Sequence, residues 1–251
     1  MGKYFTVEVK PTIPNVAAGQ HAAFANGDVL FDWMAFEIPK GAAKLIGVTA
    51  EIRPKGDAGS TVNKFAFELV FAKSKSLVAP TTLGTVNSAP AASAILDGQA
   101  DRIIGHLSIA DGHFNSDMDQ LAIATAAATE GMVLEGEPFS GNTVGTDTLY
   151  VGGIAGDAFN FVSGCTINNG DLNGPVLTVA DVDPRLFLAV GDTIAVTTTA
   201  DTSVSKSMGV IKSIDSDTQI TLESAFTTGD VTNDDFVYNV SPIRLVLTFE
   251  K

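Results

Sequence analysis

The feature that most constrains the fold is the alternation of apolar and polar residues in short runs between turn-forming residues. It is clearest from residue 188 to residue 238, where runs such as Asp192–Thr198 and Gln219–Leu222 are bounded by Gly, Asp, Asn and Ser. A two-residue period is the pattern of a strand with one buried face, and these bounding residues are typical of tight turns. The sequence therefore predicts an all-β protein.

The composition limits the partners of the chain. Its 251 residues carry a formal net charge of −14, so its field repels nucleic-acid phosphates and anionic lipids. We therefore expect no direct nucleic-acid partner and no membrane partner. No apolar run approaches the roughly 18 residues that cross a bilayer, and the first residues lack the apolar centre of a signal peptide, so synthesis in the cytoplasm is expected. The single cysteine, Cys165, excludes an intramolecular disulfide.

The first half of the chain is predicted to form one domain of long strands. The segment 63–73 places Phe65, Phe67, Leu69 and Phe71 on one face, which is the expected centre of a core. The next segment, 74–100, is rich in small residues and is expected to be an extended arm used for contacts. Other strands are predicted at residues 4–10, 29–38, 44–53 and 102–110, and at 120–134, where the alanines also allow a helix.

Charge divides the chain into two domains. Residues 138–240 contain 3 Lys or Arg against 13 Asp or Glu, whereas residues 1–137 contain 10 against 15. The tail, 243–249, is again rich in large apolar residues and resembles the strand at 63–73. We therefore expect residues 1–138 and 241–251 to form an antiparallel sandwich or jelly-roll-like domain. Residues 139–240 would be an inserted acidic domain, either a small β-barrel or a β-sandwich.

The acidic residues are the main candidates for metal binding. Asp215, Asp217, Asp234 and Asp235 could supply oxygen ligands to calcium, but the residue order of an EF-hand is missing, and turn capping explains the same residues. His106 and His113 follow no zinc spacing. We predict no metal and no cofactor, with calcium as the one ion left open.

Motifs of catalysis are missing from the sequence. It contains no Gly-x-Ser-x-Gly, no phosphate-binding glycine loop, and no histidine beside Ser163-Gly164-Cys165. A carboxylate pair set by the fold stays open, because its spacing cannot be read from a sequence. We expect a protein that is not an enzyme.

The composition and residue pattern of several strands resemble those of one class of proteins. With few charges, abundant Ala, Gly and Thr, and an acidic β insertion, the segments 31–41, 44–52 and 210–222 look like those of a virion structural protein of a tailed bacteriophage, of the capsid decoration or cement type. The resemblance implies a sandwich or jelly roll on the capsid surface of the virion. It also implies docking on the major capsid protein and self-association as a homo-oligomer, with a trimer among the options. It assigns no functional residue.

Two sets of residues are candidates for binding. For docking on a capsid, the interface candidates are Trp33, Phe36, Leu77, Val78 and Leu83, and the acidic insertion would project outward. The alternative is a receptor- or carbohydrate-binding module of a tail fibre or a cell surface. That function needs an exposed aromatic platform, for which Trp33, Tyr150 and Tyr238 are the candidates.

Overall fold

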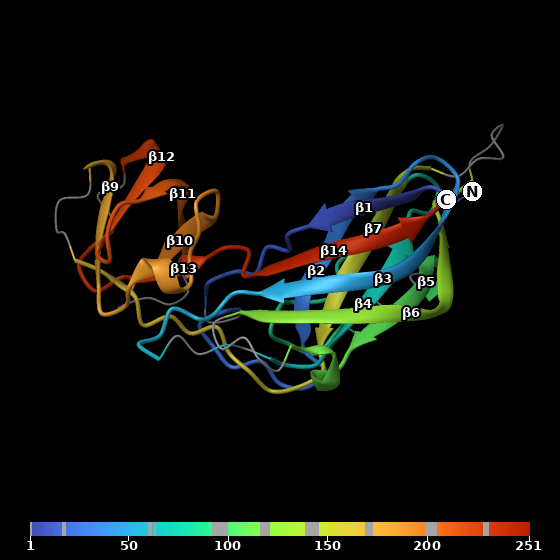
Figure 1. Cartoon of the computed structure of the whole chain (residues 1–251), viewed down its shortest axis with the longest axis horizontal. Helices are drawn as coiled ribbons and strands as arrows, with labels where there is room; N and C mark the ends of the chain where they lie inside the picture. Colours follow the sequence, from blue (N-terminus) through green and yellow to red (C-terminus); the bar gives the residue numbers. More distant parts are fainter. Residues whose placement is uncertain are drawn as a thin grey trace.

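The computed structural model shows an elongated molecule with two β domains (Figure 1). Its described residues contain no helix that is long and apolar enough to cross a membrane. The structure describes residues 2–16, 19–59, 62, 64–91, 100–115, 121–138, 146–168, 173–198, 205–227 and 231–251.

The first domain is a sandwich of two four-stranded antiparallel sheets. The first sheet contains, in spatial order, β1 (Tyr4–Val9), β14 (Ile243–Glu250), β3 (Ala42–Ile52) and β6 (Ala122–Glu135). The second sheet contains, in spatial order, β2 (Val29–Glu37), β7 (Thr148–Ala155), β4 (Phe67–Lys73) and β5 (Ile103–Ile109). Among these eight strands the first sheet has the order 1-8-3-6 and the second the order 2-7-4-5, which is the arrangement of a jelly roll. The predicted all-β sandwich is confirmed.

The second domain is a closed barrel inserted between β7 and β14. Because a closed barrel has no free edge, all six strands have neighbours on both sides. The strands are β10 (Thr193–Thr197), β11 (Ser205–Ile214), β12 (Gln219–Thr227), β9 (Asn173–Ala180), β8 (Thr166–Ile167) and β13 (Phe236–Asn239), in their order around the barrel.

The predicted start of the insertion at residue 139 is wrong. Strand β7 pairs with β2 and with β4, so residues 148–155 belong to the sandwich, and the barrel begins only with β8. The error came from the charge count, because the chain turns acidic only after Ala155, and Asp147 is the sole charged residue between Pro138 and that point. At the other border, β13 ends at Asn239 and β14 begins at Ile243.

The last strand closes the core of the sandwich. Strand β14 lies between β1 and β3, and its inward side chains are fully buried. The ring of Phe36 bridges the sheets, since its centroid lies 6.4 Å from that of Phe71 and 6.2 Å from that of Phe249. Each such side chain contributes about 1.5–3 kcal/mol by leaving water. The inward side chains of β14 are Ile243, Leu245, Leu247 and Phe249.

Both chain ends lie at the end of the sandwich that is farthest from the barrel (Figure 1). Their backbones pair directly, with Lys3 N–H to Lys251 O at 3.0 Å and Lys251 N–H to Lys3 O at 2.9 Å. We call this end of the molecule the distal end.

A segment after β1 ties the barrel to the sandwich. Gln20 is buried, and its Nε2 donates to the carbonyl oxygens of Ile13 and Asn239, both at 2.8 Å. The hydroxyl of Tyr238 lies 2.6 Å from Nδ1 of His21. These contacts couple the two domains through polar groups that are shielded from water, where hydrogen bonds are strongest.

Candidate functional site

The candidate metal ligands do not converge in the described parts of the chain. No group of three or more His, Cys, Asp or Glu is placed there to hold an ion. Asp215 and Asp217 lie in the turn between β11 and β12, where Asp215 accepts hydrogen bonds from Ser213 and Thr221, and these bonds lower the pKa of its carboxyl. Asp234 and Asp235 lie in the separate turn before β13, where Asp235 accepts the N–H of Thr232 at 2.9 Å.

The two histidines of the sandwich line one open hollow between β5 and β6. Nδ1 of His106 contacts the carboxylate of Glu68, and Nδ1 of His113 accepts the N–H of Ala110 at 3.1 Å. Each imidazole therefore has a partner in the sandwich.

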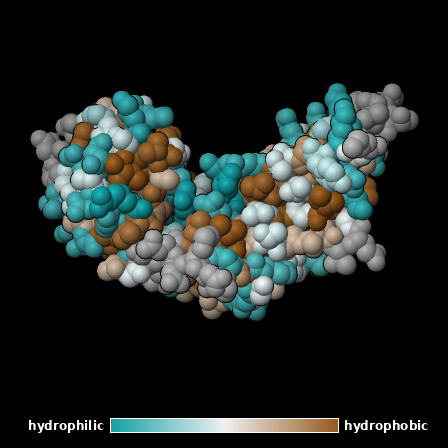
Figure 2. Space-filling model, viewed as in Figure 1, coloured by the Kyte–Doolittle hydropathy of each residue, from teal (hydrophilic) through white to brown (hydrophobic). Residues whose placement is uncertain are grey.

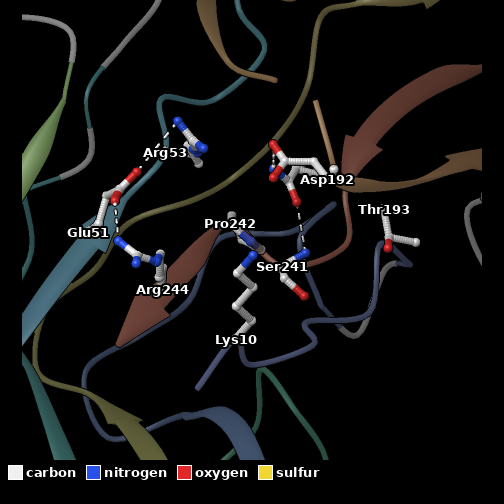
Figure 3. A pocket seen from close by; sticks show the side chains of 10 residues that line it. Lys10, Glu51, Arg53, Asp192, Thr193, Ser241, Pro242 and Arg244 are labelled. Carbon is white, nitrogen blue, oxygen red and sulfur yellow. Dashed lines mark hydrogen bonds and ion pairs between the residues drawn. The ribbon is translucent and has the colours of Figure 1, made fainter. Parts of the chain in front are cut away.

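A pocket of about 80 Å³ lies at the junction of the two domains (Figure 3). Its most notable side chains are the cations Lys10, Arg53 and Arg244, which come from the sandwich. The other lining residues are Glu51, Gly191, Asp192, Thr193, Asn239, Ser241 and Pro242.

The cations of this junction pocket are paired with carboxylates of the first sheet. Arg244 contacts Glu8 at 2.7 Å and Glu51 at 3.3 Å, and it holds the pKa of the Glu8 carboxyl below its usual range. Arg53 lies 3.5 Å from Glu51, and Lys10 lies 3.4 Å from Glu8.

The remaining carboxylate of the pocket, that of Asp192, accepts Nδ2 of Asn239 at 2.9 Å. Chemically, the pocket is a set of ion pairs where the first sheet meets the barrel.

The exposed turn after β4 has an unusual backbone. Lys75 and Val78 close it with reciprocal hydrogen bonds of 3.1 and 3.0 Å, and both central residues have positive φ, 53° at Ser76 and 60° at Leu77. Such turns favour Gly and Asn, and a bulky side chain in this conformation costs energy. A strained turn persists only where neighbouring groups hold it.

Charged side chains hold this turn from two directions. The carboxylate of Glu137 accepts the N–H groups of Ser76 and Leu77, and these bonds lower its pKa. Nη1 of Arg102 donates to the carbonyl oxygens of Val78 and Ala79, at 3.0 and 2.6 Å.

This turn presents two aliphatic side chains to solvent. Leu77 is 63% exposed and Val78 is 59% exposed. The turn follows β4, whose last residue, Lys73, pairs with Leu149 of β7 at the distal end. We call Leu77 and Val78 the apolar knob.

The chain matches no family model, and no curated protein is similar to it in sequence. Function must therefore be inferred from the geometry of the chain itself.

Two of the predicted interface residues are buried, Phe36 inside the sandwich and Leu83 on the outer face of the second sheet. Phe36 packs between the sheets, and Leu83 lies with Trp33 over Gly152, with its N–H donated to Asp32 at 2.7 Å. Neither side chain can dock on a partner. The pairing of β2 with β7 is irregular between Phe31 and Met34, so Phe31 and Phe36 both face the core although they are five residues apart, and Trp33 lies on the outer face. Part of the arm, residues 92–99, lies outside the described residues.

The three aromatic residues of the alternative platform are not brought together. Trp33 and Tyr150 are half-buried on the outer face of the second sheet. Tyr238 is buried at the domain junction against His21. A platform could therefore contain two of the three rings at most.

Proposed function

We propose that the protein is a non-enzymatic virion structural protein that decorates and cements a bacteriophage capsid by binding the lattice of the major capsid protein. The observation that carries this proposal is the apolar knob, a turn held in a strained conformation so that Leu77 and Val78 point into solvent. Strain of this kind is kept where a surface must be presented in one conformation. The knob is the docking element, and it occupies the distal end.

The distribution of charge supports this orientation. Residues 156–240, which include the barrel, contain 12 Asp or Glu and 3 Lys or Arg. The rest of the chain contains 17 Asp or Glu and 12 Lys or Arg, so its charge is far closer to neutral. With the distal end on the capsid, the acidic barrel projects outward, where its charge keeps particles apart.

The strength of docking follows from the number of copies. Burying Leu77 and Val78 contributes about 1.5–3 kcal/mol each, which is weak for one molecule after the cost of association. Copies that are linked to one another bind a lattice together, and each further contact is then intramolecular. Weak knobs are therefore sufficient for cementing when the copies associate.

The experiment mixes purified protein with capsids that lack it and measures bound stoichiometry and the temperature of DNA release. The wild-type protein is expected to bind at a fixed ratio and to raise that temperature. The double variant L77S/V78S should lose most binding, while V190S, which changes an exposed barrel valine, should bind as the wild type does. Wild-type protein that does not bind capsids would sink the proposal.

The second candidate function is a glycan-binding module, favoured by Trp33 and Tyr150 on one sheet face. Trp33 is the sole tryptophan, so its fluorescence reports on that face alone. Quenching by glycans, with no capsid binding, would favour this function over cementing.

A further inference from the structure

The outer face of the first sheet carries exposed side chains that form a grid of cross-strand rows. Its strands pair antiparallel, with a register shift in β14 between Thr248 and Phe249 and another in β3 between Leu45 and Gly47, and the paired residues define four cross-strand rows. From the distal end, the first row is Tyr4, Glu250, Lys44 and Val133, and the second is Thr6, Thr248, Gly47 and Ala127. The third row is Glu8, Val246, Thr49 and Thr125, and the fourth is Arg244, Glu51 and Ile123.

The middle of this face is low and almost uncharged. The small side chains over Gly47 and Ala127 leave a hollow of about 230 Å³, which Ile46 and Thr248 also border. In Figure 2 this face is turned toward the viewer, and pale and brown residues cover much of it. Charged residues of β14 and β3 stand only in the first and fourth rows, and the two rows between them carry small, mostly uncharged side chains, with Glu8 of β1 as their one charge.

The charges on the two central strands are self-complementary. Strand β14 carries Glu250 in the first row and Arg244 in the fourth, whereas β3 carries Lys44 in the first and Glu51 in the fourth. A second copy placed face to face, related by a two-fold axis parallel to the strands, sets β14 against β3 of that copy. Glu250 then meets Lys44 of the second copy, and Arg244 meets Glu51 of the second copy. Because the symmetry repeats each pair, four attractive contacts form.

The outer strands match in the same arrangement. Tyr4 and Val133 lie at the two ends of the first row, on β1 and β6, and their exposed fractions are 68% and 64%. The same axis sets Tyr4 of one copy over Val133 of the other. Two of the most exposed large apolar side chains thus cover each other.

We infer that this sheet face, defined by the Glu250–Lys44 and Arg244–Glu51 rows around the hollow at Gly47, binds a second copy of the chain. Aligned packing of two sheets face to face is a common arrangement of β-sandwiches. Four strands about 4.8 Å apart and four rows about 6.8 Å apart cover about 500 Å² per copy, or about 1,000 Å² in all. That area is at the lower limit of specific interfaces, so the dimer should be weak and concentration-dependent.

The inference rests on the proposed function for its purpose, because linked copies are what make weak knobs sufficient. The two can nevertheless fail separately. A wild-type protein that is monomeric yet binds capsids overturns the inference alone, whereas a dimer that ignores capsids overturns the proposed function alone.

The experiment uses charge reversal and mixing, with association measured by sedimentation at low salt. Wild-type protein should dimerise, and K44E and E250K should each weaken dimerisation at least tenfold, since each sets like charges opposite each other. An equimolar mixture of K44E and E250K should associate again. In the mixed dimer, the carboxylate introduced at position 44 of one chain meets the ammonium introduced at position 250 of the other. The unchanged Glu250 of the first chain likewise meets the unchanged Lys44 of the second.

Mixing separates the intermolecular effect from the intramolecular one, because Lys44 and Glu250 are also neighbours within one chain. A change in folding alone cannot be rescued by mixing, and melting temperatures of the two variants provide a check. K212E, which makes the same change on the exposed surface of β11, should dimerise as the wild type does. Monomeric wild-type protein at all concentrations, or a mixture no better than its components, would overturn the inference.

Discussion

The carboxylate of Glu137 accepts the main-chain N–H of Leu77 at 2.9 Å, across 60 residues of sequence. The same carboxylate also accepts the N–H of Ser76, so the two strained residues of the turn share one acceptor. The knob is thus held in part by a residue of another strand connection, and the charge of that side chain strengthens the two hydrogen bonds.

Removing that charge should loosen the turn. In E137Q the amide offers a single neutral oxygen, which accepts more weakly than a carboxylate. Amide hydrogen exchange at Ser76 and Leu77 should accelerate at least severalfold, with little change elsewhere. E135Q, at the nearby end of β6, is the matched control, and equal exchange in both variants would contradict the role of Glu137.

The same turn should loosen in acid. Hydrogen bonds from Leu77 and Ser76 favour the ionised carboxylate and so lower the pKa of Glu137. Because this pKa is lowered, the ionised carboxylate stabilises the turn fully above the ordinary pKa of 4.5, and that stabilisation is lost as the pH falls through the pKa of the folded protein. The exchange rate of the Ser76 amide, taken relative to its intrinsic rate at each pH, should therefore rise below pH 4.5 in the wild type. In E137Q this relative rate should not change with pH.

The aromatic contact between the sheets should carry much of the stability of the sandwich. The ring of Phe249 is fully buried, with its centroid 6.2 Å from that of Phe36 in the second sheet and 5.2 Å from that of Phe5 on the neighbouring strand. F249A should lower the free energy of unfolding by about 3–5 kcal/mol, because it leaves a cavity between β1 and β3. V246A, on the outer face of the same strand, should change it by about 0.5 kcal/mol or less in denaturant titration at low protein concentration. Similar losses in both variants would contradict this account.

The tyrosine at the domain junction should ionise late. Burial raises the pKa of Tyr238 to about 12, because the phenolate would lose its hydration, although a hydrogen bond at Ser163 partly opposes this. The pKa in the folded protein lies above the ordinary value of 10. The stability that comes from keeping the Tyr238 hydroxyl protonated is therefore fully present below pH 10 and is lost as the pH rises toward 12. Phenolate absorbance should show a step near pH 12 that Y238F lacks, and an identical titration in Y238F would refute the assignment.

The hydrogen bonds of Gln20 should determine how rigidly the barrel is held against the sandwich. Q20A removes two buried hydrogen bonds, to Ile13 and Asn239, each worth about 1 kcal/mol. We expect a loss of about 2 kcal/mol and earlier melting of the junction than of either core. NMR relaxation should then show the barrel tumbling more independently, and unchanged relaxation would show that other contacts suffice.

The large apolar residues of the tail predicted correctly that β14 returns to the sandwich, and the alternation of residues predicted the aromatic row of β4, because residues two apart in a strand share one face. It failed at β2, where an irregular register places Phe31 and Phe36 on the same inner face, although residues five apart in a regular strand lie on opposite faces. Such bulges depend on the neighbouring strand and leave no local signal.

The knob was predicted only in part. Leu77 and Val78 were expected at an interface, but the sequence Lys75-Ser-Leu-Val78 contains no Gly or Asn to announce a turn with positive φ. The turn exists because Glu137 and Arg102 hold it, and both are distant in sequence. The grid on the first sheet likewise requires the pairing of β14 with β3, which composition does not supply.

The paired backbones of Lys3 and Lys251 have a practical consequence. A short peptide can join these ends without disturbing either sheet, so circular permutants opened at a barrel turn should fold. Their new termini would lie on the barrel, and a peptide fused there would be displayed away from the knob. Fusions at residues 1 and 251 would instead crowd the distal end, which makes permutation the better route to a display scaffold.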